Sequence, residues 1–164
     1  MTTEPPSASR RHSDDLQHRE RGARSMTVPS SAPSAQPNDR CFACGSRNTH
    51  GLRLCFARDG KHAVTAVWRP DEVWEGYRGV IHGGIVSTVL DEAMSKAVAA
   101  AGIRALTCEI RVRLRQRVEV AEELRIRGWV VEKRKRRIVT EATLTAPNGA
   151  ERAHAWATFL ELQQ

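Results

Sequence analysis

The stretch "GYRGVIHGGIVSTVLDEAM", residues 76–94, decides both the fold of this chain and the place of its chemistry. It contains His82-Gly83-Gly84 and continues as an apolar segment that carries two adjacent acids, Asp91 and Glu92. An unpaired carboxylate is costly to bury, so a core helix has no packing use for one. A tight turn does not need a histidine either. The stretch therefore predicts chemistry, unless the acids lie on the solvent side of a helix.

The segment after the glycines has the spacing of an amphipathic helix. Its apolar residues recur in pairs, three or four positions apart, at positions 85, 86, 89, 90, 93, 94, 97 and 98. The two glycines before it and Gly102 after it punctuate a helix of about 17 residues.

Strands are predicted on both sides of this helix. Leu52, Leu54 and Phe56 alternate before an Asp-Gly turn, and residues 63–68 return, which is typical of a β-hairpin. Four more strands are predicted after the helix, within residues 105–115, 123–133, 137–146 and 150–162. One helix cannot cover two faces of a six-stranded sheet. We therefore expect an α+β fold, in which an antiparallel six-stranded sheet wraps around one long central helix.

The strand "ALTCEIRVRLR", residues 105–115, alternates along its whole length. Its apolar even-numbered residues, from Leu106 to Leu114, are predicted to be buried. Its odd-numbered residues, which include Thr107 and three arginines, are predicted to face water.

Composition divides the chain into two unequal parts. Residues 1–40 hold most of the prolines and almost no large apolar residue, which predicts a disordered tail. Residues 41–164 are long enough for one folded domain. No apolar run follows Arg10-Arg11, and no stretch has the length of a membrane span. We expect a cytoplasmic protein that does not enter a membrane, with Met26 as an alternative start.

The net charge is +7, from 26 basic and 19 acidic residues. The excess lies in "RVRLRQR" (111–117) and "KRKRR" (133–137), and it favours an anionic partner such as nucleic acid, anionic lipid or a phosphorylated small molecule. A wet strand face and an exposed hairpin tip explain both runs more simply. Stacking on nucleic acid also needs aromatic residues nearby, and in sequence only Trp129 qualifies. We expect no nucleic-acid partner.

The cysteines raise the question of a metal. Cys41-x-x-Cys44-Gly has the spacing of half a zinc ribbon or of a redox pair. The other half is missing, because Cys55 and Cys108 lie far apart, and no histidine has a common zinc spacing. We therefore expect reduced thiols in a folded turn and no metal.

Several motifs together resemble the hotdog-fold acyl-CoA thioesterases, specifically their PaaI-like and THEM4-like branch. The motifs are "CFACGSRNTHGL" at 41–52, "YRGVIHGG" at 77–84, an acid nine residues after the histidine, and "AWATFLEL" at 155–162. The resemblance covers nearly all of residues 41–162. It implies hydrolysis of an acyl- or aryl-CoA thioester to the free acid and CoA, without a cofactor.

The resemblance also implies roles for individual residues. The Gly83 amide would bind the thioester carbonyl oxygen, Asp91 would act as base or nucleophile, and Thr107 would orient the water. We assign His82 to fixing the turn rather than to proton transfer. The substrate-binding positions expected around the motif are Tyr77, Gly79 and Gly84. Many relatives carry an asparagine six residues before the histidine, where this chain has Gly76.

Elementary physics supports these roles. Glycines at a helix start expose unpaired amides, and the helix dipole favours a developing oxyanion there. Gly83 and Asp91 are eight residues apart, which is about 12 Å along a helix. Catalytic groups must approach one carbonyl to about 3 Å. The site must therefore combine Gly83 of one chain with Asp91 of another, which predicts a homodimer or homotetramer.

Two alternatives remain open. One is a hotdog protein that binds acyl-CoA without hydrolysing it, as a sensor or carrier. The other is a basic module that binds nucleic acid.

Overall fold

A computed structural model of the chain describes residues 38–162. The expected tail, residues 1–40, lies almost wholly outside this range, as does Met26. The elements are β1 (Ala57–Arg58), β2 (Ala63–Trp68), the 3₁₀-helix η1 (Glu72–Trp74), β3 (Glu75–Tyr77), β4 (Val80–Ile81), α1 (Gly83–Ala100), β5 (Ala105–Leu114), β6 (Leu124–Arg134), β7 (Arg137–Thr145) and β8 (Glu151–Glu161). No helix within the described range combines the length and apolar character that a membrane crossing needs.

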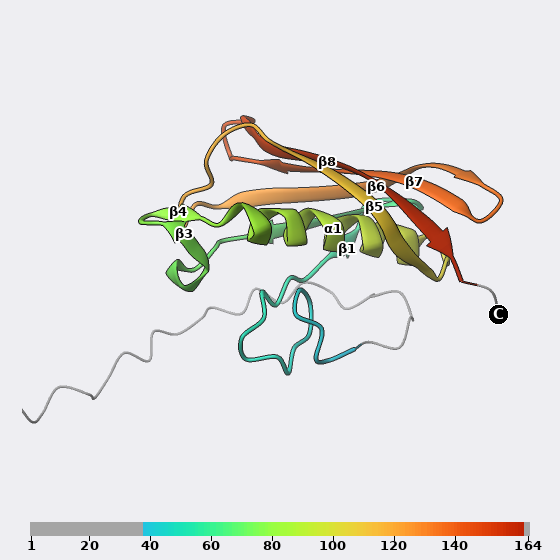
Figure 1. Cartoon of the computed structure of the whole chain (residues 1–164), viewed down its shortest axis with the longest axis horizontal. Helices are drawn as coiled ribbons and strands as arrows, with labels where there is room; N and C mark the ends of the chain where they lie inside the picture. The colour runs from blue at the N-terminus through green and yellow to red at the C-terminus, as the bar shows by residue number, and fades with distance from the viewer. Residues whose placement is uncertain (1–37, 163–164) are drawn as a thin grey trace, which may run out of the picture.

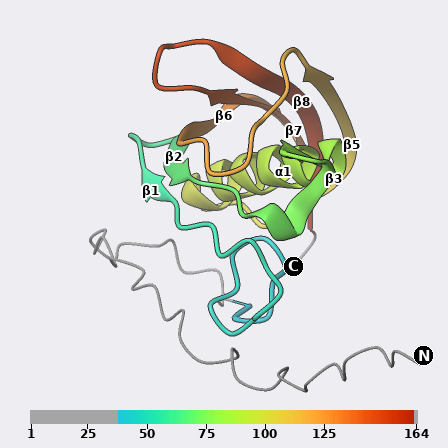
Figure 2. The ribbon, with the colours of Figure 1, turned by 90° about the vertical axis from the view of Figure 1, so that its left-hand side faces the viewer.

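The larger strands form one antiparallel sheet that curls around α1. Its strand order is β1-β2-β6-β7-β8-β5, and each neighbouring pair is antiparallel. Figures 1 and 2 show the sheet lying along one side of α1 and bending over it. The predicted α+β fold, with a six-stranded antiparallel sheet around one long helix, is confirmed.

Small residues let α1 approach the sheet closely. A Cβ at Gly128 on β6 would lie 2.5 Å from the Ala93 carbonyl oxygen of the helix, so only glycine fits there. Alanines line the buried face of β8 at positions 153, 155 and 157. Larger side chains that are at most 1% exposed fill the space around this contact: Leu90, Met94, Ile126 and Phe159. The helix is thereby fixed in position along the sheet.

The ends of α1 follow from its flanking residues. His82 caps the first turn and Gly83 begins the helix. Gly102 follows the last turn with a φ of +79°, the left-handed conformation that favours glycine after a helix. The predicted helix of about 17 residues between glycines is 18 residues long.

The predicted first hairpin is only partly correct. β1 has two residues, and most of the segment before it does not pair with β2. Leu52 and Leu54 are buried as expected, but their amides donate to the carbonyls of Phe42 and Ala43, each at 2.8 Å. The segment therefore packs as a loop against the turn that contains the first two cysteines.

A short hairpin that the sequence analysis did not predict leads into the helix. β3 and β4 pair with each other after η1, and the Ile81 amide donates to the Val118 carbonyl at 2.9 Å. The loop after β5 thereby holds the segment that precedes α1.

β5 is an edge strand and is more exposed than predicted. Its one neighbour in the described sheet is β8. Leu106, Ile110 and Leu114 are 64%, 39% and 53% exposed. The expected burial of these side chains is wrong for a single chain, because no further strand covers this edge. An apolar edge strand is a surface on which another chain can pair.

Candidate active site

The first turn of α1 leaves one amide without a partner. His82 Nδ1 accepts a hydrogen bond from the Gly84 amide at 2.9 Å, and the His82 carbonyl accepts from Ile85 and Val86. No acceptor within residues 38–162 reaches the Gly83 amide. His82 thus makes the turn-fixing contact expected of it. The remaining N–H, at the positive end of the helix dipole, suits an oxygen that gains negative charge.

Gly76 lies against this histidine. A Cβ at Gly76 would come within 3.1 Å of His82 Cα and 3.2 Å of its ring carbon Cδ2. The hairpin that contains Gly76 therefore packs directly on the N-cap residue. A side chain at position 76 would therefore require the hairpin and His82 to shift apart by a few tenths of an ångström.

A pocket of about 340 Å³ opens at the same end of the helix. Its lining residues come from β3, β4, the first turn of α1 and the end of β5: Tyr77, Val80, Ile81, Gly83, Val86, Leu114, Arg115, Gln116, Arg117 and Val118. Of the expected substrate-binding residues, Tyr77 lines the pocket, whereas Gly79 and Gly84 lie beside it. Sequence reasoning missed the segment 114–118, because it carries no motif and is brought here by the sheet.

A β-bulge turns Thr107 towards the helix. The register of β5 against β8 shifts between Thr107 and Glu109, so that Thr107 pairs with the buried Phe159. Beyond the bulge the even-numbered residues share this face, and Ile110 pairs with the buried Ala157. The prediction that Thr107 lies on the side opposite Ile110 is therefore wrong, although its side chain is exposed as expected. An unbroken alternation cannot show the extra residue of a bulge.

The bulge brings Thr107 to Asp91 on α1. The Thr107 hydroxyl Oγ1 donates to Asp91 Oδ1 at 2.9 Å. Burial raises the pKa of the Asp91 carboxyl above its ordinary value, while the hydrogen bond from Thr107 opposes this shift and the charge of Glu92 adds to it. A half-buried carboxylate with a raised pKa is better suited to accept a proton than an exposed one.

Glu92 points to a different part of the chain. The sequence left open that both acids lie on the solvent side of the helix, but the Glu92 side chain is only 14% exposed. It forms an ion pair with Lys96 at 3.3 Å and lies beside Cys41 and Cys44. Asp91 and Glu92 are adjacent in sequence, but their side chains therefore lie in different surroundings.

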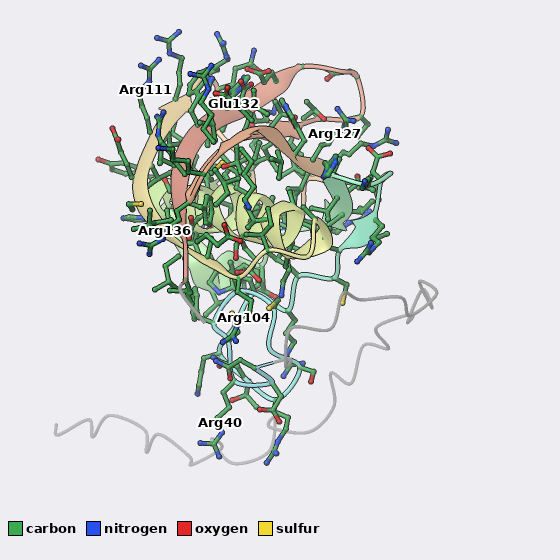
Figure 3. The ribbon with its side chains drawn as sticks, turned by 90° about the vertical axis from the view of Figure 1, so that its right-hand side faces the viewer. Arg40, Arg104, Arg111, Arg127, Glu132 and Arg136 are labelled. Carbon is green, nitrogen blue, oxygen red and sulfur yellow. The ribbon has the colours of Figure 1, made fainter. Side chains whose placement is uncertain are left out.

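The arginines at the end of the first basic run, Arg115 and Arg117, line the pocket, and the second run lies at the tip between β6 and β7. Figure 3 shows Arg111 and Arg127 projecting on the side of the sheet away from α1. The Arg111 guanidinium lies 4.8 Å from the centre of the Trp156 ring, and His154 stacks on the same ring at 4.2 Å. The chain's own side chains therefore occupy the faces of this tryptophan, which leaves little for nucleic-acid bases to stack on.

Comparisons with known proteins agree with this architecture. A family model described as the thioesterase superfamily matches residues 78–153. No curated protein matches the chain. A crystal structure of a thioesterase superfamily protein has a TM-score of 0.71 and 19% identity over 74% of this chain, and the match spans 60% of that protein.

Two other solved structures come from named bacteria. A hypothetical thioesterase from Streptococcus pneumoniae, with coenzyme A, has a TM-score of 0.64 and 19% identity over 68% of this chain and 87% of that one. It was also solved as an Asp→Ala and a Thr→Ala variant, at positions sixteen residues apart. The PaaI protein of the Escherichia coli phenylacetic acid degradation operon has a TM-score of 0.65 and 12% identity over 68% of this chain and 81% of that one.

Identities this low show the fold alone, whereas the family model also matches the sequence of the helix and most of the sheet. The chain has the hotdog fold of these structures, and its residues 78–153 match the thioesterase superfamily model. The resemblance drawn from its motifs is thereby confirmed.

Proposed function

We propose that this chain hydrolyses an acyl- or aryl-CoA thioester to the free acid and CoA, in a site that two copies of the chain share. The observation that carries the proposal is the Asp91–Thr107 pair, in which a half-buried carboxylate is held by a hydroxyl from a bulged strand.

The reaction can proceed in either of two ways. With Asp91 as general base, the carboxylate takes a proton from water, and the water oxygen forms a bond to the thioester carbon. Thr107 donates to Asp91, so its lone pairs can accept a hydrogen bond from that water. The Gly83 amide stabilises the oxyanion, the carbon–sulfur bond then breaks, and the CoA thiolate takes the proton back. With Asp91 as nucleophile, the carboxylate bonds to the thioester carbon and the carbon–sulfur bond breaks, so that CoA leaves as the thiolate, which takes up a proton. Water then hydrolyses the acyl-aspartate to the free acid and Asp91.

The two-chain site follows from the geometry of α1 and β5. The helix separates Gly83 from Asp91 by about 12 Å, so one helix cannot present both to one carbonyl. Gly83 lies next to Leu114 at one end of β5, and Asp91 contacts Thr107 at the other end. Antiparallel pairing of two β5 strands about their middle would bring Leu114 of the partner subunit close to Thr107. Gly83 of the partner subunit would then lie on the side of Asp91.

The assignment of a CoA ester rests on chemistry and on the relatives. Arg115 and Arg117 line the pocket beside Gly83, where they pair with Glu151 and Glu119, and their guanidinium groups can also contact the phosphates of a carrier. The streptococcal relative was solved with coenzyme A. The Asp and Thr replaced in its variants have the same sixteen-residue separation as Asp91 and Thr107 here.

The test is a hydrolysis screen across short-chain, long-chain and aromatic CoA esters. Chromatography should follow the released CoA, because the exposed Cys55 and Cys108 would react with thiol dyes. We expect turnover of at least one ester class, abolished in Asp91→Asn. Tight binding of a CoA ester without turnover would instead support the sensor or carrier alternative. No binding and no turnover of any ester would refute both.

A further inference from the structure

The N-terminal loop brings a third metal-binding side chain to the cysteine pair. The sequence predicted no metal, because no second pair of ligands follows Cys41 and Cys44. In the structure, Glu92 of α1 joins them: one donor atom from each of the three side chains lies within 4.8 Å of the other two. Figures 1 and 2 show why, since the loop that begins at residue 38 lies on the side of α1 away from the sheet.

The loop is held in this position by its own backbone. The Cys41 amide donates to the Asn38 carbonyl at 3.0 Å, and the Gly45 amide donates to the Cys41 carbonyl at 2.9 Å. A Cβ at Gly45 would lie 2.5 Å from the Cys41 nitrogen, so the turn needs a glycine there. Buried Leu52 and Leu54 anchor the end of the loop in the core. The backbone of the loop therefore holds both thiols next to α1 without help from a bound ligand.

The chemistry of these side chains fits a borderline-soft divalent cation. Thiolates together with a carboxylate suit Zn²⁺ and, for spectroscopy, Co²⁺. Two thiolates and one carboxylate carry three negative charges, which a divalent cation and the adjacent Lys96 ammonium together neutralise. Burial, together with Glu92, raises the pKa of the Cys44 thiol to about 12 in the metal-free chain, so a bound metal has to displace that proton.

We propose that Cys41, Cys44 and Glu92 bind one Zn²⁺ ion per chain and thereby tie the N-terminal loop to α1. Three protein ligands leave a fourth tetrahedral position for water or another small ligand. Glu92 then has a role distinct from that of Asp91, and the site does not depend on the proposed thioester hydrolysis.

The experiment titrates Co²⁺ into the reduced, chelator-treated full-length chain without air. We expect near-ultraviolet thiolate-to-cobalt absorption that saturates at one Co²⁺ per chain and disappears when Zn²⁺ displaces the cobalt. We also expect Zn²⁺ to raise the melting temperature, since it binds the folded state. Wild-type protein without the thiolate–cobalt absorption would overturn the proposal, whatever the variants do.

Matched variants assign the ligands. Cys41→Ser and Cys44→Ser should each lose the metal on gel filtration, and Glu92→Gln should weaken Co²⁺ binding by about 10-fold or more. Cys55→Ser and Cys108→Ser, which alter exposed thiols elsewhere, should bind as the wild type does. Unchanged Co²⁺ affinity in Glu92→Gln would refute the three-ligand site. A Cys41–Cys44 disulfide in the isolated protein, with no Co²⁺ binding after reduction, would instead identify a redox pair.

Discussion

Asp91→Asn is the substitution that separates chemistry from folding at the proposed site. Asparagine has nearly the same shape, and its side-chain oxygen can still accept the hydrogen bond from Thr107. It can neither take a proton from water nor attack a carbonyl carbon. A general base contributes roughly 10²–10⁴-fold, so we expect kcat to fall by at least about 100-fold with little change in KM.

The same substitution has a predictable effect on stability. Burial raises the pKa of Asp91 in the folded state above its unfolded value. Between these two values the folded state binds more protons than the unfolded state, so the wild type loses stability as pH rises. Above the folded pKa that loss is complete and constant. Asp91→Asn has no carboxyl to titrate and lacks this loss. The free energy of unfolding of the variant minus that of the wild type should therefore increase as pH rises through this window, and it should stay at the higher value at neutral pH.

Two assays test both effects in the same samples. Steady-state hydrolysis of the best CoA ester gives kcat and KM, and urea unfolding at several pH values gives the free energy of unfolding. Asp59→Asn is the matched control, because Asp59 is not on the helix and makes an exposed ion pair with Arg127. Near-normal turnover by a folded Asp91→Asn would refute the catalytic assignment. A loss of stability at neutral pH would refute the account of its burial.

Three further substitutions test the surroundings of the site. Thr107→Val removes a hydrogen bond to a charged group and should lower kcat by about 10- to 100-fold. It should also shift the acid limb of the pH–rate profile to higher pH, because the lost hydrogen bond lowers the pKa of Asp91. Thr107→Ser should restore both kcat and the position of the acid limb. Gly128→Ala places a Cβ against the Ala93 carbonyl and should lower the free energy of unfolding in urea by about 1–3 kcal/mol; an unchanged value would contradict the close helix–sheet contact. Ile110→Asp puts a charge on the β5 edge and should abolish dimers and turnover together in sedimentation and activity assays; active monomers would contradict the shared site.

Local patterns predicted the helix and the order of strands well, because the signals that define them lie within a few residues. The apolar pairs from Ile85 to Val98, with Gly102 after them, were enough to place α1. The position of Thr107 could not be obtained in this way. Its contact with Asp91 depends on a bulge against β8, and the partner strand that creates the bulge lies about fifty residues later.

The second site shows the same limit more sharply. From the spacing of Cys41 and Cys44 we predicted no metal, because the proposed third donor is on α1, far away in sequence. The sequence alone allowed Glu92 to lie on the solvent side of the helix. The loop that covers it lacks regular secondary structure, so no periodic pattern predicts where that loop packs.

The measurement that tests the shared site most directly is complementation between two inactive variants. Gly83→Pro removes the amide N–H at the first helical position, which accepts proline. Gly83→Ala is its control: it adds a comparable Cβ near Leu114 but keeps the N–H, and it should stay active. Mixed Gly83→Pro and Asp91→Asn chains should form heterodimers in which one of the two sites has both native groups. After confirmed subunit exchange, we expect about a quarter of the wild-type activity from random pairing in a dimer. A mixture that stays inactive although heterodimers have formed would contradict the two-chain site.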